Sequence, residues 1–250
     1  MDRIPGKFVW FEHFSNDIPK ARRFYEGLFG WHTEAMPMGE QRYHLLMNGS
    51  EGIGGFRTAA GGVPSHWFSY LSVTDVDAVH AKALAAGARE QFKPMDMGAV
   101  GRASGLLDPT GAAFALWKGS QGDRPDPERT PVGDWVWNEL WTPDEAKALS
   151  FYESVFDYTR ETMDMGEQGN YFILKTGERG RGGVMRAPDP FMPPMWMPYV
   201  HVADCDAAVA KATALGAQVP MAGTDIAGVG RIAMLRDPLG AAVAVIKPNM

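Results

Sequence analysis

Hydrophobic and polar residues alternate over an early segment of the chain, as they do in a β-strand. The side chains expected on one face of this segment are Phe8, Trp10, Glu12 and Phe14. A period of two is typical of a strand with one face buried. Apolar residues then recur at helical spacing, at Ala21, Phe24, Tyr25 and Leu28. The pattern therefore predicts a strand followed by an amphipathic helix.

The same plan restarts further along the chain. Short strands are predicted first around residues 43–47 and 52–57, and then at 68–73. A helix is predicted over 76–86, with Gly87 placed to end it. Two more strands are predicted at 102–107 and 112–118. Between them, Asp108-Pro109-Thr110-Gly111 suits a type I turn.

The second half of the chain repeats the first. Phe8-Val-Trp-Phe-Glu12 matches Trp135-Val-Trp-Asn-Glu139, and the Phe-Tyr-Glu of residues 24–26 recurs at 151–153. Asp108-Pro-Thr-Gly111 likewise matches Asp237-Pro-Leu-Gly240. Because order and spacing hold from end to end, the sequence is one domain written twice, and we expect each copy to fold on its own. We predict copy one at 1–118, an exposed linker rich in Pro and Gly at 119–133, and copy two at 134–250.

The first helix of copy two carries a recognisable start signal, Thr142-Pro143-Asp144-Glu145. A threonine can cap a helix, proline suits the first helical position, and a glutamate three residues after the cap completes a capping box. We therefore expect Thr142 to be the N-cap.

Together these motifs resemble the vicinal-oxygen-chelate superfamily, which includes glyoxalase I, bleomycin-resistance proteins and extradiol dioxygenases. Nearly the whole chain outside the linker is covered, and the arrangement is similar to the tandem subgroup described as glyoxalase-like or hydroxylase. The resemblance implies an α+β fold of four βαβββ units. They would form two tandem glyoxalase/bleomycin-resistance-type domains with curved, mostly antiparallel sheets. Fold alone does not define function.

Metal-dependent members of this superfamily place His, Gln or Glu at four positions facing a cleft. Carried onto this chain by the resemblance, these positions are Trp10, Phe68, Ala115 and one near Gly55, and in copy two Trp137, Met197, Ala244 and one near Gly183. None of these side chains can ligate a hard divalent metal. We therefore expect a metal-free cleft and no cofactor, with a divalent metal as the alternative.

The remaining inward-facing residues suggest a site for a flat or cationic organic ligand, with aromatic walls and a small floor. The expected ligand-binding residues are Trp10, Tyr70, Arg102, Ala115, Trp137, Tyr199, His201, Arg231 and Ala244. Alternatively, the aromatic residues simply fill the core, and His201, whose counterpart is Ser72, is a hydrogen-bonded structural residue.

Glu12 and Glu139 lie between aromatic residues on that face, where a carboxylate is costly unless it is paired. They are the candidate catalytic residues. The structural alternative pairs them with the repeat-matched Arg102 and Arg231.

Two functions follow from these residues. The first is a protein of the bleomycin-resistance kind that binds a small aromatic or cationic ligand without a metal. The second is an enzyme, a glyoxalase (lactoylglutathione lyase)-like lyase, a dioxygenase or a hydroxylase, with Glu12 or Glu139 as acid or base. In a third hypothesis, one copy has only a structural role and the other copy alone binds the ligand.

Composition and charge restrict the partners and the cellular location that we expect. The formal net charge is −6, which argues against a nucleic-acid partner. No run of about 18 apolar residues indicates a membrane span, and the start of the chain carries no export signal. Cys205 is the single cysteine, so no internal disulfide can form, and we expect its thiol to be inert. A cytoplasmic monomer or homodimer with a small-molecule ligand is predicted.

Overall fold

The structure is a computed structural model that describes residues 2–38, 41–166 and 169–249. We call each βαβββ unit a module. The first module of copy one contains β1 (Phe8–Ser15), α1 (Ile18–Phe29), β2 (His32–Met38), β3 (Gln41–Asn48) and β4 (Glu51–Thr58). The second contains β5 (His66–Ser72), α2 (Val76–Ala85), β6 (Arg89–Asp96), the short 3₁₀ helix η1 (Gly98–Val100), β7 (Gly101–Leu107) and β8 (Ala113–Gly119).

Copy two repeats this order. Its first module contains β9 (Trp135–Thr142), α3 (Glu145–Phe156), β10 (Thr159–Asp164), β11 (Asn170–Thr176) and β12 (Arg179–Arg186). Its second contains β13 (Met195–His201), α4 (Cys205–Ala214), β14 (Gln218–Ile226), β15 (Gly230–Arg236) and β16 (Ala242–Pro248).

Within the described residues the strands form two eight-stranded mixed sheets, one from each copy. Their orders are β2-β3-β4-β1-β5-β8-β7-β6 and β10-β11-β12-β9-β13-β16-β15-β14. In every module the first strand pairs in parallel with the last, and the hairpins between are antiparallel. The predicted α+β fold of four modules in two tandem domains is confirmed.

Hydrophobic periodicity did not identify the outer strands β2, β6, β10 and β14. Most side chains of these strands are exposed, so they carry little apolar alternation. The second strand of each module was therefore implied only by the resemblance.

The start of α3 differs from the expectation. Asp144 is the N-cap, and its side chain accepts a hydrogen bond from the backbone N–H of Lys147. Thr142 lies two residues earlier, where its hydroxyl accepts from the N–H of Asp144. The expected cap was wrong because Pro143 precedes the cap instead of opening the helix.

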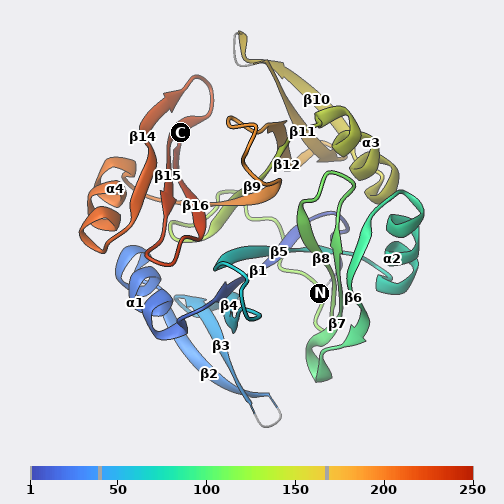
Figure 1. Cartoon of the computed structure of the whole chain (residues 1–250), viewed down its shortest axis with the longest axis horizontal. Coiled ribbons are helices and arrows are strands. Elements are labelled where there is room, and N and C mark those ends of the chain that lie inside the picture. The colour runs from blue at the N-terminus through green and yellow to red at the C-terminus, as the bar shows by residue number, and fades with distance from the viewer. Residues whose placement is uncertain (1, 39–40, 167–168, 250) are drawn as a thin grey trace. The chain divides into compact units, whose positions relative to one another are not determined.

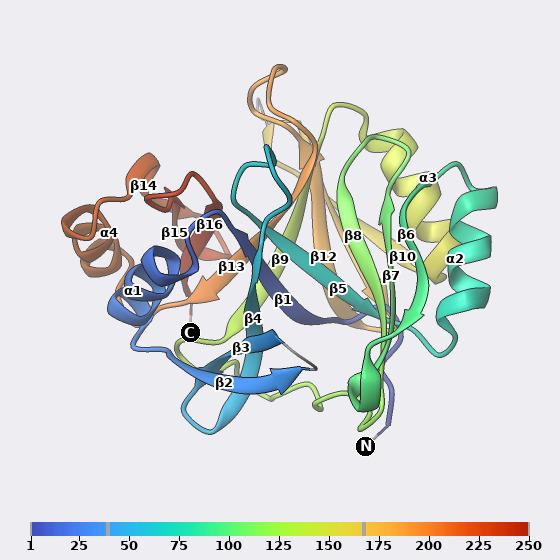
Figure 2. The ribbon, with the colours of Figure 1, turned by 60° about the horizontal axis from the view of Figure 1, so that its bottom comes forward.

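The chain divides into two compact units that do not follow the repeat. We name them by their helices (Figure 1). The α2–α3 unit consists of Met1–Trp10, Ser69–Asp126 and Trp137–Trp196, and the α1–α4 unit of Phe11–Phe68, Pro127–Val136 and Met197–Met250. Each unit thus combines one module from each copy, and α2 lies beside α3 in both views (Figures 1 and 2). The predicted boundaries at 118 and 134 stay a prediction.

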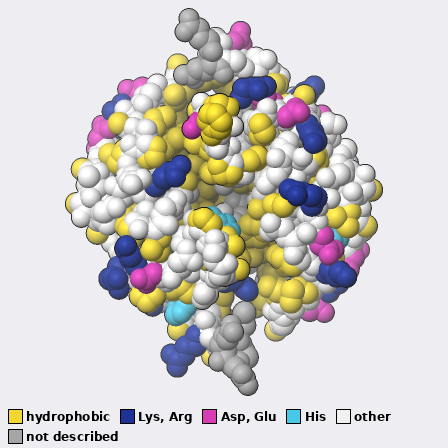
Figure 3. Space-filling model, in the orientation of Figure 1, with side chains coloured by type: hydrophobic (Ala, Val, Ile, Leu, Met, Phe, Trp, Pro, Cys, Tyr) yellow, Lys and Arg dark blue, Asp and Glu magenta, His cyan; other side chains and the backbone are white. Residues whose placement is uncertain are grey.

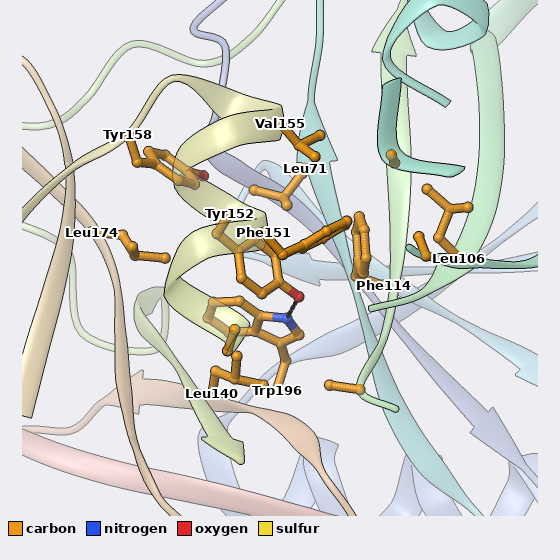
Figure 4. Packing of buried hydrophobic residues seen from close by; sticks show 14 of the residues in the cluster. Leu71, Leu106, Phe114, Leu140, Phe151, Tyr152, Val155, Tyr158, Leu174 and Trp196 are labelled. Carbon is orange, nitrogen blue, oxygen red and sulfur yellow. Dashed lines mark hydrogen bonds between the residues drawn. The ribbon is translucent and has the colours of Figure 1, made fainter. Parts of the chain in front are cut away.

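The core of the α2–α3 unit contains residues of both copies (Figure 4). Phe114 of copy one meets the ring of Phe151 of copy two edge-on, with 6.1 Å between ring centroids. Trp196 donates its indole N–H to the hydroxyl of Tyr152 at 2.8 Å. Tyr152 donates in turn to Asp108 Oδ2 at 3.1 Å. The Phe-Tyr helix of copy two is therefore joined to the Asp-Pro-x-Gly turn of copy one.

The α1–α4 unit repeats this chain of hydrogen bonds with the copies exchanged. Trp67 donates to Tyr25 at 2.8 Å, and Tyr25 donates to Asp237 Oδ2 at 3.0 Å. His13 Nε2 lies 2.8 Å from the same oxygen, and both side chains of this pair are fully buried. The corresponding position of the α2–α3 unit is Leu140, so the histidine is peculiar to one unit.

Candidate functional site

The first candidate site is the Glu12 centre, which consists of Glu12, Tyr43, Gly55 and Arg57 in the α1–α4 unit. Glu12 is 3% exposed. Its Oε1 accepts hydrogen bonds from the Tyr43 hydroxyl and from Arg57 Nε, each at 2.8 Å. Gly55 lies opposite Glu12 in the register of β1 and β4, and a Cβ there would overlap the Tyr43 hydroxyl. The glycine therefore makes room for the tyrosine that holds the carboxylate.

The second candidate site is the Glu139 centre in the α2–α3 unit. Glu139 is 6% exposed and accepts a hydrogen bond from the indole N–H of Trp141 at 2.6 Å. Tyr171 also bonds to Glu139 and accepts from the indole of Trp137 at 2.8 Å. Burial, and then the charge of Glu139, raise the pKa of Tyr171 well above its ordinary value, so its hydroxyl stays protonated and can donate. Gly183 makes room for this hydroxyl, as Gly55 does in copy one.

The predicted pairing of these glutamates with Arg102 and Arg231 is wrong. Arg102 binds Asp77 at 2.7 Å and Asp96 at 2.9 Å. Arg231 makes the matching bonds to Asp206 and Asp225 at 3.0 Å. Each arginine lies opposite the second aspartate of its set in an antiparallel pair, so strand register supplies it with a nearer carboxylate.

Tyr70 and Ala115, both predicted as ligand contacts, lie directly opposite each other in the register of β5 and β8. Tyr199 and Ala244 are opposite each other in β13 and β16 in the same way. Both tyrosines are buried, and both alanines are completely buried. Tyr70 also meets Trp117 edge-on, with ring centroids 6.2 Å apart.

His201 holds the chain before copy two in place. Its Nδ1 lies 2.7 Å from the carbonyl of Thr130, and its backbone N–H donates to the carbonyl of Asp134. Trp10 and Trp137 are half-buried in β1 and β9. Burial raises the pKa of the Cys205 thiol to about 11, so the thiol is protonated at neutral pH.

The residues present do not fit the metal that the fold family implies. The positions carried over by the resemblance hold Trp, Phe, Met, Ala and Gly side chains. Across residues 2–38, 41–166 and 169–249, no cluster of three His, Cys, Asp or Glu side chains could hold a metal ion. At the fourth position, the space beside Gly55 and Gly183 is taken by a tyrosine hydroxyl.

Sequence reasoning missed Tyr43, Tyr171 and Arg57. One signal was present, because the two tyrosines are repeat-matched and each is followed by a glycine-rich strand. Arg57 could be found only from strand register, which places it two residues beyond Gly55 on the face that carries Glu12.

A separate depression of about 460 Å³ lies between α3 and the strands β10 and β11. Its lining residues are Glu145, Ala146, Leu149, Arg160, Thr162, Asn170 and Phe172. None of the predicted site residues lines it.

Basic and acidic side chains are interspersed over the face shown in Figure 3. Within the described part of the chain, no helix has the length and apolar character needed to cross a membrane.

Comparison with known proteins agrees with the fold. Residues 7–116 match the model of the Glyoxalase/Bleomycin resistance protein/Dioxygenase superfamily. The chain is 37% identical over 245 residues to "Putative glyoxylase CFP32" of Mycobacterium tuberculosis, covering 96% of this chain and 94% of that protein. It is 30% identical to the anthracycline biosynthesis protein DauV of Streptomyces sp., covering 97% of this chain and 94% of that protein.

Among solved structures, the Mn(II)-bound glyoxalase of Novosphingobium aromaticivorans is similar in fold, with a TM-score of 0.68 at 15% identity. The match covers 99% of this chain and 83% of that one. The chain therefore belongs to the glyoxalase/bleomycin resistance protein/dioxygenase superfamily, also called the vicinal-oxygen-chelate superfamily.

Proposed function

We propose that the chain binds a small aromatic or cationic organic ligand at the Glu12 or Glu139 centre, without a metal. The observation that carries the proposal is the repeated pairing of a buried glutamate with a tyrosine hydroxyl, Glu12 with Tyr43 and Glu139 with Tyr171. Burying a carboxylate is costly unless hydrogen bonds compensate for it. Its presence in both copies, beside half-buried aromatic side chains, supports a role in recognition.

The aromatic side chains indicate the class of ligand. Trp137 and Tyr171 are linked by a hydrogen bond and are both partly exposed, so their ring faces can stack on a flat molecule. Ring faces also attract organic cations. The name of the relative DauV refers to anthracycline biosynthesis, and anthracyclines contain a flat fused-ring system, which supports the same class.

A thermal-shift and tryptophan-fluorescence screen tests the proposal. The panel contains flat aromatic acids, aromatic amines, an anthracycline and aliphatic sugars. A ligand at 100 times its Kd should stabilise the protein by about 2.7 kcal/mol. We expect aromatic hits that Trp10→Ala or Trp137→Ala weakens. The control Phe191→Ala removes an aromatic ring that is 93% exposed and lies outside both centres. A flat response to the whole panel would refute ligand binding.

The relative named as a glyoxylase favours a second candidate, a lyase, dioxygenase or hydroxylase. In this case Glu12 or Glu139 takes a proton from the substrate, and the tyrosine hydroxyl beside it orients the carboxylate. Elemental analysis of protein purified without chelators tests whether a metal takes part. Turnover that survives both Glu12→Gln and Glu139→Gln would exclude these residues as proton acceptors.

A further inference from the structure

The depression between α3 and the strands β10 and β11 (Figure 1) lies on the other face of its sheet from the Glu139 centre. Phe172 lines the depression, whereas the neighbouring residue Tyr171 bonds to Glu139. Successive side chains of a strand point to opposite faces, so the sheet itself separates the two places. The volume of the depression, about 460 Å³, is in the range of roughly 300–1,000 Å³ that small-molecule sites occupy.

The floor of the depression is apolar and its rim is polar. Leu149 of α3 is 2% exposed, and Phe172 is partly buried and packs against the core of the α2–α3 unit. Thr162 lies directly opposite Phe172 in the register of β10 and β11, so its hydroxyl is on the same face as the ring. Asn170 precedes Phe172 by two residues and adds an exposed amide. An apolar floor with a few polar groups is typical of a site for a small organic molecule.

The two charged side chains of the lining indicate the charge of the ligand. The carboxylate of Glu145 is held by Arg186 through two contacts, at 3.1 Å and 2.7 Å, so its charge is already offset. Arg160 is 49% exposed, and its Nε lies 3.5 Å from Glu153, longer than a charged hydrogen bond. Its guanidinium therefore keeps donors for a ligand, and guanidinium groups match the planar geometry of a carboxylate.

Copy one gives a natural comparison. The counterparts of Leu149, Arg160 and Phe172 in copy one are Arg22, Thr33 and His44. Burial, and then the charges of Arg22 and Arg42, lower the pKa of His44, so Arg22 lies close to His44. A long basic side chain thus stands where copy two has its apolar floor, and a threonine stands where copy two has the arginine. The combination of floor and guanidinium is peculiar to copy two.

We propose that the depression between α3 and β10–β11 is a second ligand site, which binds a small carboxylate that carries an apolar ring. The guanidinium of Arg160 binds the carboxylate, and the ring lies on Leu149 and Phe172. The site is additional to the Glu12 and Glu139 centres of the proposed function and does not depend on them.

An NMR titration with phenylacetate tests the proposal, with the uncharged analogue phenylacetamide and the ringless analogue acetate for comparison. The Nε–H signal of Arg160 is assigned by its absence from the spectrum of Arg160→Gln. We expect phenylacetate to shift this signal in a saturable way, and both analogues to bind at least tenfold more weakly.

Three variants test the residues of the site, with affinity followed on the resonances of the ligand and folding checked by circular dichroism. Arg160→Gln should weaken phenylacetate binding at least tenfold. Leu149→Arg gives copy two the residue of copy one and should do the same. Ala146→Trp fills the depression from an exposed helix position and covers the case in which Leu149→Arg fails to fold. The control Arg89→Gln removes the same charge from an exposed residue of the outer strand β6 and should leave binding unchanged.

An Arg160 signal that does not respond, or equal affinity for phenylacetate and phenylacetamide, would overturn the proposal. Phenylacetate binding that is kept in Arg160→Gln and lost in Trp137→Ala would belong to the Glu139 centre, and only this inference would fail. If Arg160 responds while every ligand of the earlier screen is insensitive to Trp10→Ala and Trp137→Ala, this inference stands and the proposed function fails.

Discussion

The hydroxyl of Tyr25 donates a hydrogen bond to Asp237 at 3.0 Å, although Tyr25 lies in the first helix of copy one and Asp237 in the last turn of copy two. Tyr152 and Asp108 form the reciprocal bond at 3.1 Å. In each aspartate the other carboxylate oxygen accepts backbone N–H groups of its own turn. The two most recognisable motifs of the repeat therefore meet inside the compact units, each with the motif of the other copy.

We expect Tyr25→Phe and Tyr152→Phe to destabilise the protein by about 1–3 kcal/mol each, because each leaves a buried carboxylate oxygen and an indole N–H with one partner fewer. Tyr152→Phe should cost at least as much, since Asp237 Oδ2 keeps His13 at 2.8 Å. Urea unfolding followed by circular dichroism measures both values. A clearly larger loss for Tyr25→Phe would contradict this account of the buried pair.

The arrangement of the cores also predicts how fragments behave. Residues 1–126 and 127–250 each supply half of both compact units. A separated half would expose apolar surface that is normally covered by the other, for example Phe114 without Phe151. We expect each half alone to aggregate or self-associate, and the two refolded together to regain the native circular dichroism spectrum. The sequence alone led to the opposite expectation, and a cooperative thermal transition of residues 1–118 as a monomer would support that expectation.

The sequence was sufficient to predict the modules. It was not sufficient to predict that each compact unit combines a module of one copy with a module of the other. Strand alternation, the Phe-Tyr helix and the Asp-Pro-x-Gly turn are local patterns, so they could be identified from neighbouring residues. Both copies carry the tyrosine and the aspartate, however. No local pattern indicates whether Tyr25 bonds to Asp108 or to Asp237.

The candidate sites, too, could be predicted from the sequence only in part. Glu12 and Glu139 were identified because a carboxylate on an aromatic face needs a partner. The partners themselves were missed, because Tyr43 and Arg57 reach Glu12 through the register of three strands. Matching the copies by sequence offered Arg102 instead, which strand pairing places beside Asp96.

Asp126 should make stability depend on pH. It lies between Lys7 Nζ at 3.1 Å and Arg181 at 2.8 Å. Burial acts to raise the pKa of Asp126, but the bonds to Arg181 and Lys7 outweigh it and hold the pKa below its ordinary value. A lowered carboxyl pKa adds stability above the pKa of the unfolded chain, about 3.9. That stability is lost as pH falls through the folded-state pKa.

We therefore expect Asp126→Asn to cost about 1–2 kcal/mol at pH 7, and the difference from wild type to shrink as the pH falls from about 3.9 through the lowered folded-state pKa of Asp126. Asp157→Asn serves as the control, because Asp157 is largely exposed and asparagine also accepts its left-handed backbone conformation. Urea unfolding at a series of pH values gives both curves. A difference that stays constant from pH 7 to pH 3 would exclude the ion pair as its source.

Gly183 and Gly55 give a direct test of how the glutamate centres are built. A methyl group at either position would overlap the hydroxyl of Tyr171 or Tyr43, so Gly183→Ala and Gly55→Ala must displace the tyrosine from its glutamate. Neither glycine has a positive φ, so the substitutions act by overlap and not by backbone strain. We expect each substitution to lower the free energy of unfolding by about 1–3 kcal/mol, the range for overpacking and for a buried polar group that loses a partner.

Gly61→Ala is the control, since a Cβ there meets nothing within 4 Å. If Gly183→Ala also weakens binding of the hits from the ligand screen while Gly61→Ala does not, the tyrosine contributes to the site. Unchanged stability and unchanged binding in both glycine variants would show that neither the tyrosine nor its hydrogen bond holds the glutamate in place.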